Sequence, residues 1–145
     1  MKTQIKKICL VGNGLVVTRA VNITDDKWVV KDKQRKPFEL KGDLLLEVYL
    51  KNGEVINIEA HNGYIYDGAT IPFKIGKGNM KLLYPALFHD IMCETPSIVN
   101  YRRKLSSEIF YELLVTFQTN KIVAYGMFCC VELFQKITGK WHSEV

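Results

Sequence analysis

A short polar turn between two apolar runs is the feature that most constrains the fold of this chain. Residues 51–54, Lys-Asn-Gly-Glu, separate the runs Leu44–Leu50 and Val55–Ala60. An Asn-Gly pair suits the two positive-φ positions of a type I′ turn, which joins adjacent antiparallel strands. In the second run Ile56 and Ile58 alternate with polar residues, so one face is more apolar. The sequence therefore predicts a β-hairpin with one face in the core and the other in solvent.

Strand signals surround this hairpin, and a helical signal follows it. Three short runs have strand composition: residues 15–18, 28–30 and 63–66. A first helix is predicted to begin at Asn79 or Tyr84 and to end before the Thr-Pro-Ser segment at residues 95–97. Pro85 fits the first turn of a helix that begins at Tyr84, but it would kink one that begins at Asn79.

Two further helices are predicted in the last third of the chain. Residues 103–117 repeat apolar side chains at helical spacing, and residues 121–137 do the same. Residues 119–120, Thr-Asn, are expected to cap the last helix, which stops near Gly139. Because the strands come first and the helices after them, we expect an α+β fold with helices packed on one face of an antiparallel sheet.

Length and composition indicate one domain over residues 1–145, β-rich over 1–72 and helical over 79–140. A hydrophobic content of 48% with 24% charged residues is typical of a soluble globular protein. The apolar stretch 122–134 is interrupted by a glycine and a glutamate and is too short to span a membrane. Glycines also follow the apolar residues 8–11, so we expect no signal peptide and a cytoplasmic location.

Basic residues are concentrated in the first third of the chain. Residues 1–42 hold ten of the 20 Lys and Arg residues but only four of the 15 Asp and Glu residues. A basic run at residues 31–36 fits either a solvated hairpin tip or a patch for an anionic partner. No aromatic residues interleave this run, so we favour the hairpin tip and do not expect nucleic acid as a partner.

The four cysteines, Cys9, Cys93, Cys129 and Cys130, have no zinc-site spacing. We interpret them as free thiols packed as small apolar side chains. The alternative is a catalytic thiol at Cys93, which lies four residues after His89 and so one helical turn away from it.

The ionisable pair His89-Asp90 lies inside the apolar run Leu-Phe-His-Asp-Ile-Met at residues 87–92. Burying a charge without a partner is costly, so the pair must either join a polar network or face a pocket. A neutral imidazole can act as a general base near pH 7, and a carboxylate can orient it or bind a metal. Neighbours on a helix point about 100° apart, so the two side chains cannot face one spot equally. The structural alternative pairs Asp90 with Arg102 or Arg103.

A corner between the sheet and the helices is predicted at residues 67–72, Asp-Gly-Ala-Thr-Ile-Pro. Asp67 can accept hydrogen bonds from amide groups two residues on, and Pro72 fixes the direction in which the chain leaves. The segment is either a rigid corner alone or a support that aims the Asp67 carboxylate at a helix. Arg103 and Ser107 would reach the same pocket if the second helix packs beside the first.

Four segments in this order resemble an uncharacterised family of small bacterial, phage and prophage proteins: residues 63–72, 86–90, 103–110 and 126–141. The family pattern is a Gly-Phe-x-Thr-Asp-x-Ala-Ser-Ile-Pro corner, an Ala-x-x-His-Asp-x-Leu-Tyr helix, an Arg-x-x-Ala-Asp-x-x-Phe helix and a final helix ending near Gly-x-x-Trp. Asp67, His89, Asp90 and Arg103 match it, whereas Ser107 stands where the family has Asp. The resemblance spans residues 28–142 and implies a phage-type protein of unknown function in the cytoplasm of a bacterial host.

A fainter likeness links residues 88–93, Phe-His-Asp-Ile-Met-Cys, to the phospholipase A2 helix, in which His is the general base and the next Asp binds calcium. The calcium loop and the disulfide framework of that family are absent, so the likeness is an analogy. A phosphohydrolase of the His-Asp type would need further histidine ligands, and only His61 and His142 remain.

Two functional hypotheses follow, and the placement of the residues favours the first over the second. The first is a hydrolase-like site with His89, Asp90, Asp67 and Arg103 as catalytic candidates, in which Asp67, His89 and Asp90 are candidate ligands of a divalent metal. The second is a non-enzymatic phage accessory, virion or inhibitor protein that acts through contacts with a host or virion protein. In the second case the same polar residues hold the corner to the helices.

Overall fold

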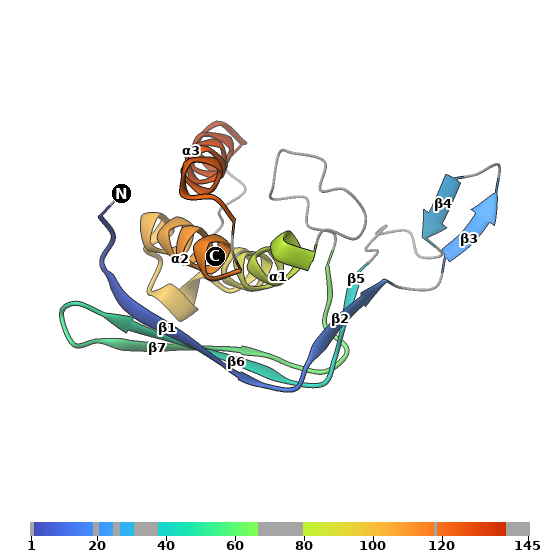
Figure 1. The fold of residues 1–145 in the computed structure, drawn as a ribbon, viewed down its shortest axis with the longest axis horizontal. Helices are drawn as coiled ribbons and strands as arrows, with labels where there is room; N and C mark the ends of the chain where they lie inside the picture. Colours follow the sequence, from blue (N-terminus) through green and yellow to red (C-terminus); the bar gives the residue numbers. More distant parts are fainter. Residues whose placement is uncertain are drawn as a thin grey trace.

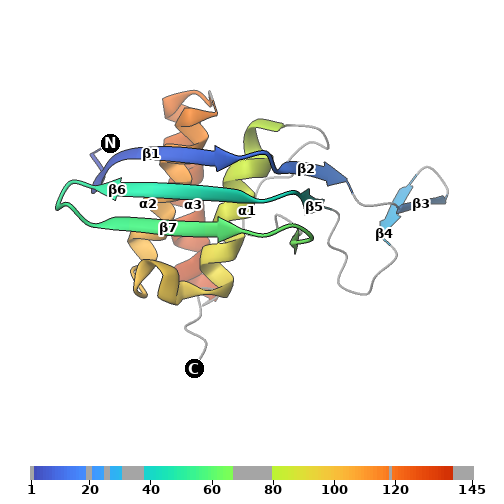
Figure 2. The ribbon, with the colours of Figure 1, turned by 90° about the horizontal axis from the view of Figure 1, so that it is seen from below.

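The computed structural model describes residues 2–18, 21–24, 27–30, 38–66, 80–117 and 119–138. Antiparallel strands are followed by three α-helices, so the predicted α+β class is confirmed (Figure 1). The main sheet has the order β1-β6-β7 and consists of β1 (Ile5–Gly12), β6 (Leu44–Leu50) and β7 (Val55–Ala60). Its helices all lie on one face, and the other face is open (Figure 2). Among the described residues, no helix combines the length and apolar character needed to cross a bilayer.

The predicted hairpin is formed by β6 and β7, but its turn is not of type I′. Gly53 has a φ of +91°, whereas the only non-glycine residues with positive φ in the described part of the chain are Asn100 and Tyr101. The Gly53 N–H donates to the Leu50 carbonyl at 3.1 Å, and the Leu50 N–H donates to the Glu54 carbonyl at 2.9 Å. These bonds define a three-residue loop with glycine in the left-handed region.

Two smaller sheets contain the remaining strands. Strands β2 (Leu15–Thr18), β5 (Phe38–Lys41) and β8 (Ile65–Tyr66) form one, and β3 (Val21–Thr24) and β4 (Lys27–Val30) form the other. The predictions at residues 15–18, 28–30 and 63–66 thus fall on strands, whereas β1, β3 and β5 were not predicted.

Strands β2 and β5 continue the paired strands β1 and β6, and both chain segments change direction at the junction. Gly12 has a φ of +118°, and a Cβ there would lie 2.4 Å from the Asp43 carbonyl oxygen, so only glycine fits. The Gly14 N–H donates to the same carbonyl at 3.2 Å. These glycines therefore allow the two chain segments to bend together.

The helices are α1 (Met80–Glu94), α2 (Arg103–Thr116) and α3 (Lys121–Thr138), with a 3₁₀ turn, Pro96–Val99, between the first two. Their bounds agree with the predictions within a few residues, and Pro85 lies inside α1 because this helix begins at Met80. Asn120 caps α3 as expected, since its Oδ1 accepts a hydrogen bond from the Ile122 N–H at 2.8 Å.

The elements form three layers, and α3 is the outermost. The core lies between the inner face of the sheet and the pair α1 and α2, where side chains such as Leu46, Ile58, Phe88 and Phe110 are fully buried. α3 packs mainly on α2, on the side away from the sheet (Figure 1). This position leaves a whole face of α3 without a neighbouring element among the described residues.

Candidate functional site

The two members of the His-Asp pair face different surroundings. The His89 ring lies 5.0 Å from the Phe110 ring of α2, between centroids. The Asp90 carboxylate lies on the side of β8, where its charge adds to burial in raising the pKa of Tyr66. Besides burial, the Asp90 charge also helps to raise the pKa of Cys93, which contacts His89, so the surroundings of the pair overlap in part. Asp67 and the corner at residues 67–72 lie outside the described residues.

His89 is completely buried and is held by neighbours on two helices. Its Nε2 lies 3.4 Å from the Gln135 side-chain nitrogen of α3, and its Nδ1 lies 3.8 Å from the Cys93 sulfur. With the Gln135 amide donating, Nε2 accepts and the ring proton is on Nδ1. Burial without a charged partner lowers the pKa of His89 to about 4, so the ring is neutral at pH 7.

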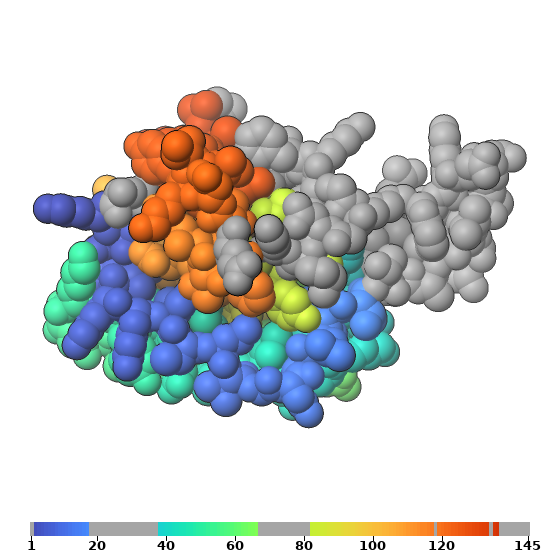
Figure 3. Space-filling model, viewed as in Figure 1, coloured from blue at the N-terminus to red at the C-terminus, as the bar shows by residue number. Residues whose placement is uncertain are grey.

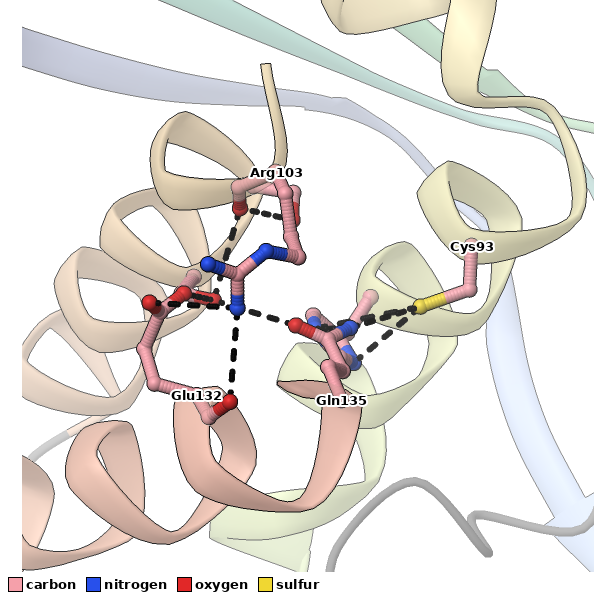
Figure 4. Close-up of polar contacts among 7 residues, drawn as sticks. Cys93, Arg103, Glu132 and Gln135 are labelled. Carbon is pink, nitrogen blue, oxygen red and sulfur yellow. Dashed lines mark hydrogen bonds and ion pairs between the residues drawn. The ribbon is translucent and has the colours of Figure 1, made fainter. Parts of the chain in front are cut away.

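A second group of polar side chains lies beside His89. Nη1 of Arg103 is 3.3 Å from Oε2 of Glu132 and also donates to the Glu132 backbone carbonyl at 3.3 Å. The Ser107 hydroxyl donates to Oε1 of Glu132 at 2.6 Å and lies 3.5 Å from Oε1 of Gln135. Figure 4 shows Gln135 between Cys93 on one side and Arg103 and Glu132 on the other.

These contacts join three helices into one network, which we call the interhelix polar cluster. It consists of His89, Cys93, Arg103, Ser107, Glu132 and Gln135. Of the residues singled out in the sequence, His89, Cys93, Arg103 and Ser107 come together there. Arg102 instead forms a bidentate pair with Glu54, with N–O distances of 2.6 and 3.0 Å.

Sequence reasoning missed the two residues of α3 that complete the cluster. Glu132 and Gln135 are three residues apart, so both lie on the side of α3 that meets α1 and α2. Gln135 is only 3% exposed. A glutamate and a glutamine at this spacing in an apolar helix were the signal that could have identified them.

The polar groups of the cluster already have hydrogen-bond or ion-pair partners within it. In the described ranges no three His, Cys, Asp or Glu side chains are grouped to hold a metal. The Glu132 carboxylate is used by Arg103 and Ser107, so it is not available as a free ligand. Burial raises the pKa of the Cys93 thiol to about 12, which keeps it protonated and weakly nucleophilic. The metal hypothesis with Asp67, His89 and Asp90 stays a prediction, because Asp67 is not described.

A second candidate surface lies on the opposite side of α3. We call it the α3 outer face, and its members are Ile122, Tyr125, Gly126, Cys129 and Leu133. They occupy positions i, i+3, i+4, i+7 and i+11, counted from Ile122, which places them in one stripe along the helix. Ile122 is 82% exposed, Leu133 59% and Tyr125 49%. The space-filling view shows α3 as an outermost part of the molecule (Figure 3).

A groove of about 430 Å³ lies where the N-terminal segment meets the β6–β7 turn and the start of α2. Lys2, Lys51 and Lys104 line it together with Glu108. The buried Glu108 carboxylate accepts hydrogen bonds from the backbone N–H and the side-chain amide of Gln4, at 2.8 and 3.1 Å. This carboxylate offsets part of the lysine charge.

Comparison with protein-family models, with curated proteins and with solved structures finds no match to this chain. The interhelix polar cluster and the α3 outer face are therefore the two features on which a functional interpretation rests.

Proposed function

We propose that this protein is a non-enzymatic binding protein that contacts another protein through the α3 outer face. The observation that carries the proposal is the exposed apolar stripe of Ile122, Tyr125 and Leu133 on the outermost helix. Large contiguous apolar patches on a protein surface mark interaction sites, and Tyr is among the residues that often dominate binding energy. The interhelix polar cluster then serves to hold α3 in position.

The buried histidine supports a structural role over the hydrolase hypothesis. A general base must come within hydrogen-bond reach of the proton that it removes. His89 is 0% exposed, its Nε2 is engaged by Gln135, and its ring packs on Phe110. The Arg103 guanidinium is likewise engaged by Glu132. None of these groups needs a substrate to satisfy its hydrogen bonds.

The resemblance to small phage and prophage proteins supports the same class of function. An accessory, virion or inhibitor protein of this size acts by occupying a surface of a host or virion protein, and it needs no catalytic group. The departure at Ser107 from the family Asp is also easier to reconcile with a binding role, because the serine hydroxyl is used to bind Glu132.

The proposal is tested by comparing variants of the two sides of α3. Purified chain is used to capture a stoichiometric partner from host extract, and thermal unfolding of each variant is followed by circular dichroism. We expect Ile122→Ser with Leu133→Ser to lose the partner while keeping its melting temperature within a few degrees. His89→Ala is expected to lower the melting temperature clearly, because it leaves a buried cavity beside Phe110 and removes the partner of Gln135.

Two results would overturn the proposal. One is a partner that remains bound at the same stoichiometry to the Ile122→Ser, Leu133→Ser variant. The other is a His89→Ala protein that melts like the wild type, which would remove the structural role of the cluster.

A further inference from the structure

Resting on the proposed function, we infer that the occupant of the α3 outer face is an amphipathic helix of another protein, with acidic residues near both of its ends. Two observations point to this chemistry: the charges that flank the stripe and an unexplained glycine at its centre. Each can be tested separately.

The charges at the two ends of the stripe are both positive. Lys121 and Lys136 are exposed, and neither forms an ion pair with another residue that the structure describes. Glu132, which lies next to the stripe, is already neutralised by Arg103. The two lysines are fifteen positions apart on one helix, which corresponds to about 22 Å at 1.5 Å per residue. A partner of similar length with acidic groups at its ends complements this pattern.

Gly126 lies near the middle of the stripe and has no role in the fold of the described chain. A Cβ at this position would meet no atom within 4 Å. Glycine inside a helix is less favourable than alanine by about 1 kcal/mol, so its presence calls for a reason. A small residue at the crossing point allows two helices to approach closely, towards the lower end of the usual range of about 8–10 Å between axes. The glycine therefore fits a helix as the occupant.

The same charges argue against a second copy of this chain. In an antiparallel pair of α3 helices that cross at Gly126, Lys121 of one copy would lie about one and a half turns from Lys136 of the other. In a parallel pair, each lysine would face its own equivalent. Like charges placed together at an interface are unfavourable. A lipid surface would be attracted by the lysines, but it would give no reason for glycine at position 126.

The test uses two synthetic helical peptides with the same leucine face, one with Glu residues at both ends and one with Lys residues there. Binding of each labelled peptide to the full chain is measured by fluorescence anisotropy at low and at high salt. We expect the Glu-flanked peptide to bind at least tenfold more tightly, with a preference that shrinks as salt screens the charges. Lys121→Glu with Lys136→Glu should reverse the order of the two peptides. Gly126→Leu should weaken binding of the Glu-flanked peptide at least tenfold while the chain stays folded.

The outcomes separate this inference from the proposed function. If both peptides bind equally and Ile122→Ser with Leu133→Ser abolishes binding, the charge inference fails and the contact role of α3 stands. If neither peptide binds, the inference also fails, and partner capture decides the proposed function independently. Light scattering that shows a dimer lost in the Ile122→Ser, Leu133→Ser variant would identify a second copy instead. Binding to phosphatidylserine vesicles that is lost in the same variant would identify a membrane surface instead.

Discussion

The inner face of α3 buries polar side chains, whereas its outer face exposes apolar ones, so the two faces depart from the usual distribution in opposite ways. The inner face buries Gln135 and most of Glu132 among neighbouring helices, whereas the outer face exposes Ile122 and Leu133. Each buried polar group has a specific partner, so the inner face defines where α3 sits on α1 and α2. The apolar groups outside have no such partner among the described residues. The difference suggests that one face fixes the helix and the other is available for binding.

The largest effect is expected from placing a carboxylate at position 107 in the cluster. In Ser107→Asp the new carboxylate would lie against Oε1 of Glu132, which now accepts a hydrogen bond at 2.6 Å. Two buried carboxylates with one arginine between them should lower the free energy of unfolding by about 3 kcal/mol, measured by urea denaturation. Ser107→Ala, the control, should cost about 1 kcal/mol. A Ser107→Asp protein as stable as the wild type would show that the cluster is not tightly packed.

A slightly smaller decrease in the free energy of unfolding is expected when the pH is lowered. The pKa of His89 is lowered to about 4 by burial, whereas an unfolded histidine titrates near 6.5. Above pH 6.5 neither state holds the extra proton. As the pH falls from about 6.5 towards 4, only the unfolded state gains it, so the free energy of unfolding decreases by up to about 1.4 kcal/mol per pH unit.

Replacing this histidine isolates its share of the pH dependence. His89→Gln should flatten the loss of stability between pH 6.5 and 4, relative to the wild type, in urea titrations at each pH. His61→Gln is the matched control, because it makes the same substitution at a side chain that is 74% exposed. An unchanged slope in His89→Gln would contradict the assignment of a buried, neutral ring.

On the outer face a substitution is expected to stabilise the protein rather than to destabilise it. Gly126→Ala should raise the free energy of unfolding by about 1 kcal/mol, because alanine is the better helix former and the added methyl group meets nothing. The substitution should at the same time weaken partner binding. A destabilised Gly126→Ala protein would mean that this position is covered within the fold.

The smallest effect concerns thiol reactivity and leaves the fold unchanged. Cys129 is exposed, whereas Cys93 is mostly buried and its thiol stays protonated. Alkylation with iodoacetamide at pH 8, followed by peptide mass spectrometry, should modify Cys129 well before Cys93. Rapid modification of Cys93 in the native protein would revive the hypothesis of a reactive thiol.

The sequence predicted the fold where local pattern decides it. The alternating run Val55–Ala60, the Asn-Gly turn and the helical periodicities gave the class and most bounds. The turn type was wrong because Asn52 uses its side chain to accept the Glu54 N–H at 2.9 Å, and only Gly53 takes a positive φ. Strand β1 was missed because most of its residues are exposed, so it lacks a clear alternation.

The candidate site was predictable only in part, for a similar reason. His89, Arg103 and Ser107 stood out as polar residues at helical positions, and the packing of α1 on α2 brings them near each other. The role of Gln135 depends on how a third helix lies on the other two, which no local pattern encodes. The same tertiary arrangement decides that Ile122 and Leu133 are exposed rather than buried.

The central claim is that the side chains on the inner face of α3 stabilise the fold, whereas those on the outer face do not. Urea unfolding of Gln135→Ala beside Ile122→Ser tests it most directly. We predict that Gln135→Ala lowers the free energy of unfolding by about 2 kcal/mol, because the buried His89 Nε2 and the Cys93 sulfur lose the amide that donates to them. Ile122→Ser should change it by less than about 0.5 kcal/mol, as expected of an exposed site. Equal losses in the two variants, or a larger loss for Ile122→Ser, would contradict the claim.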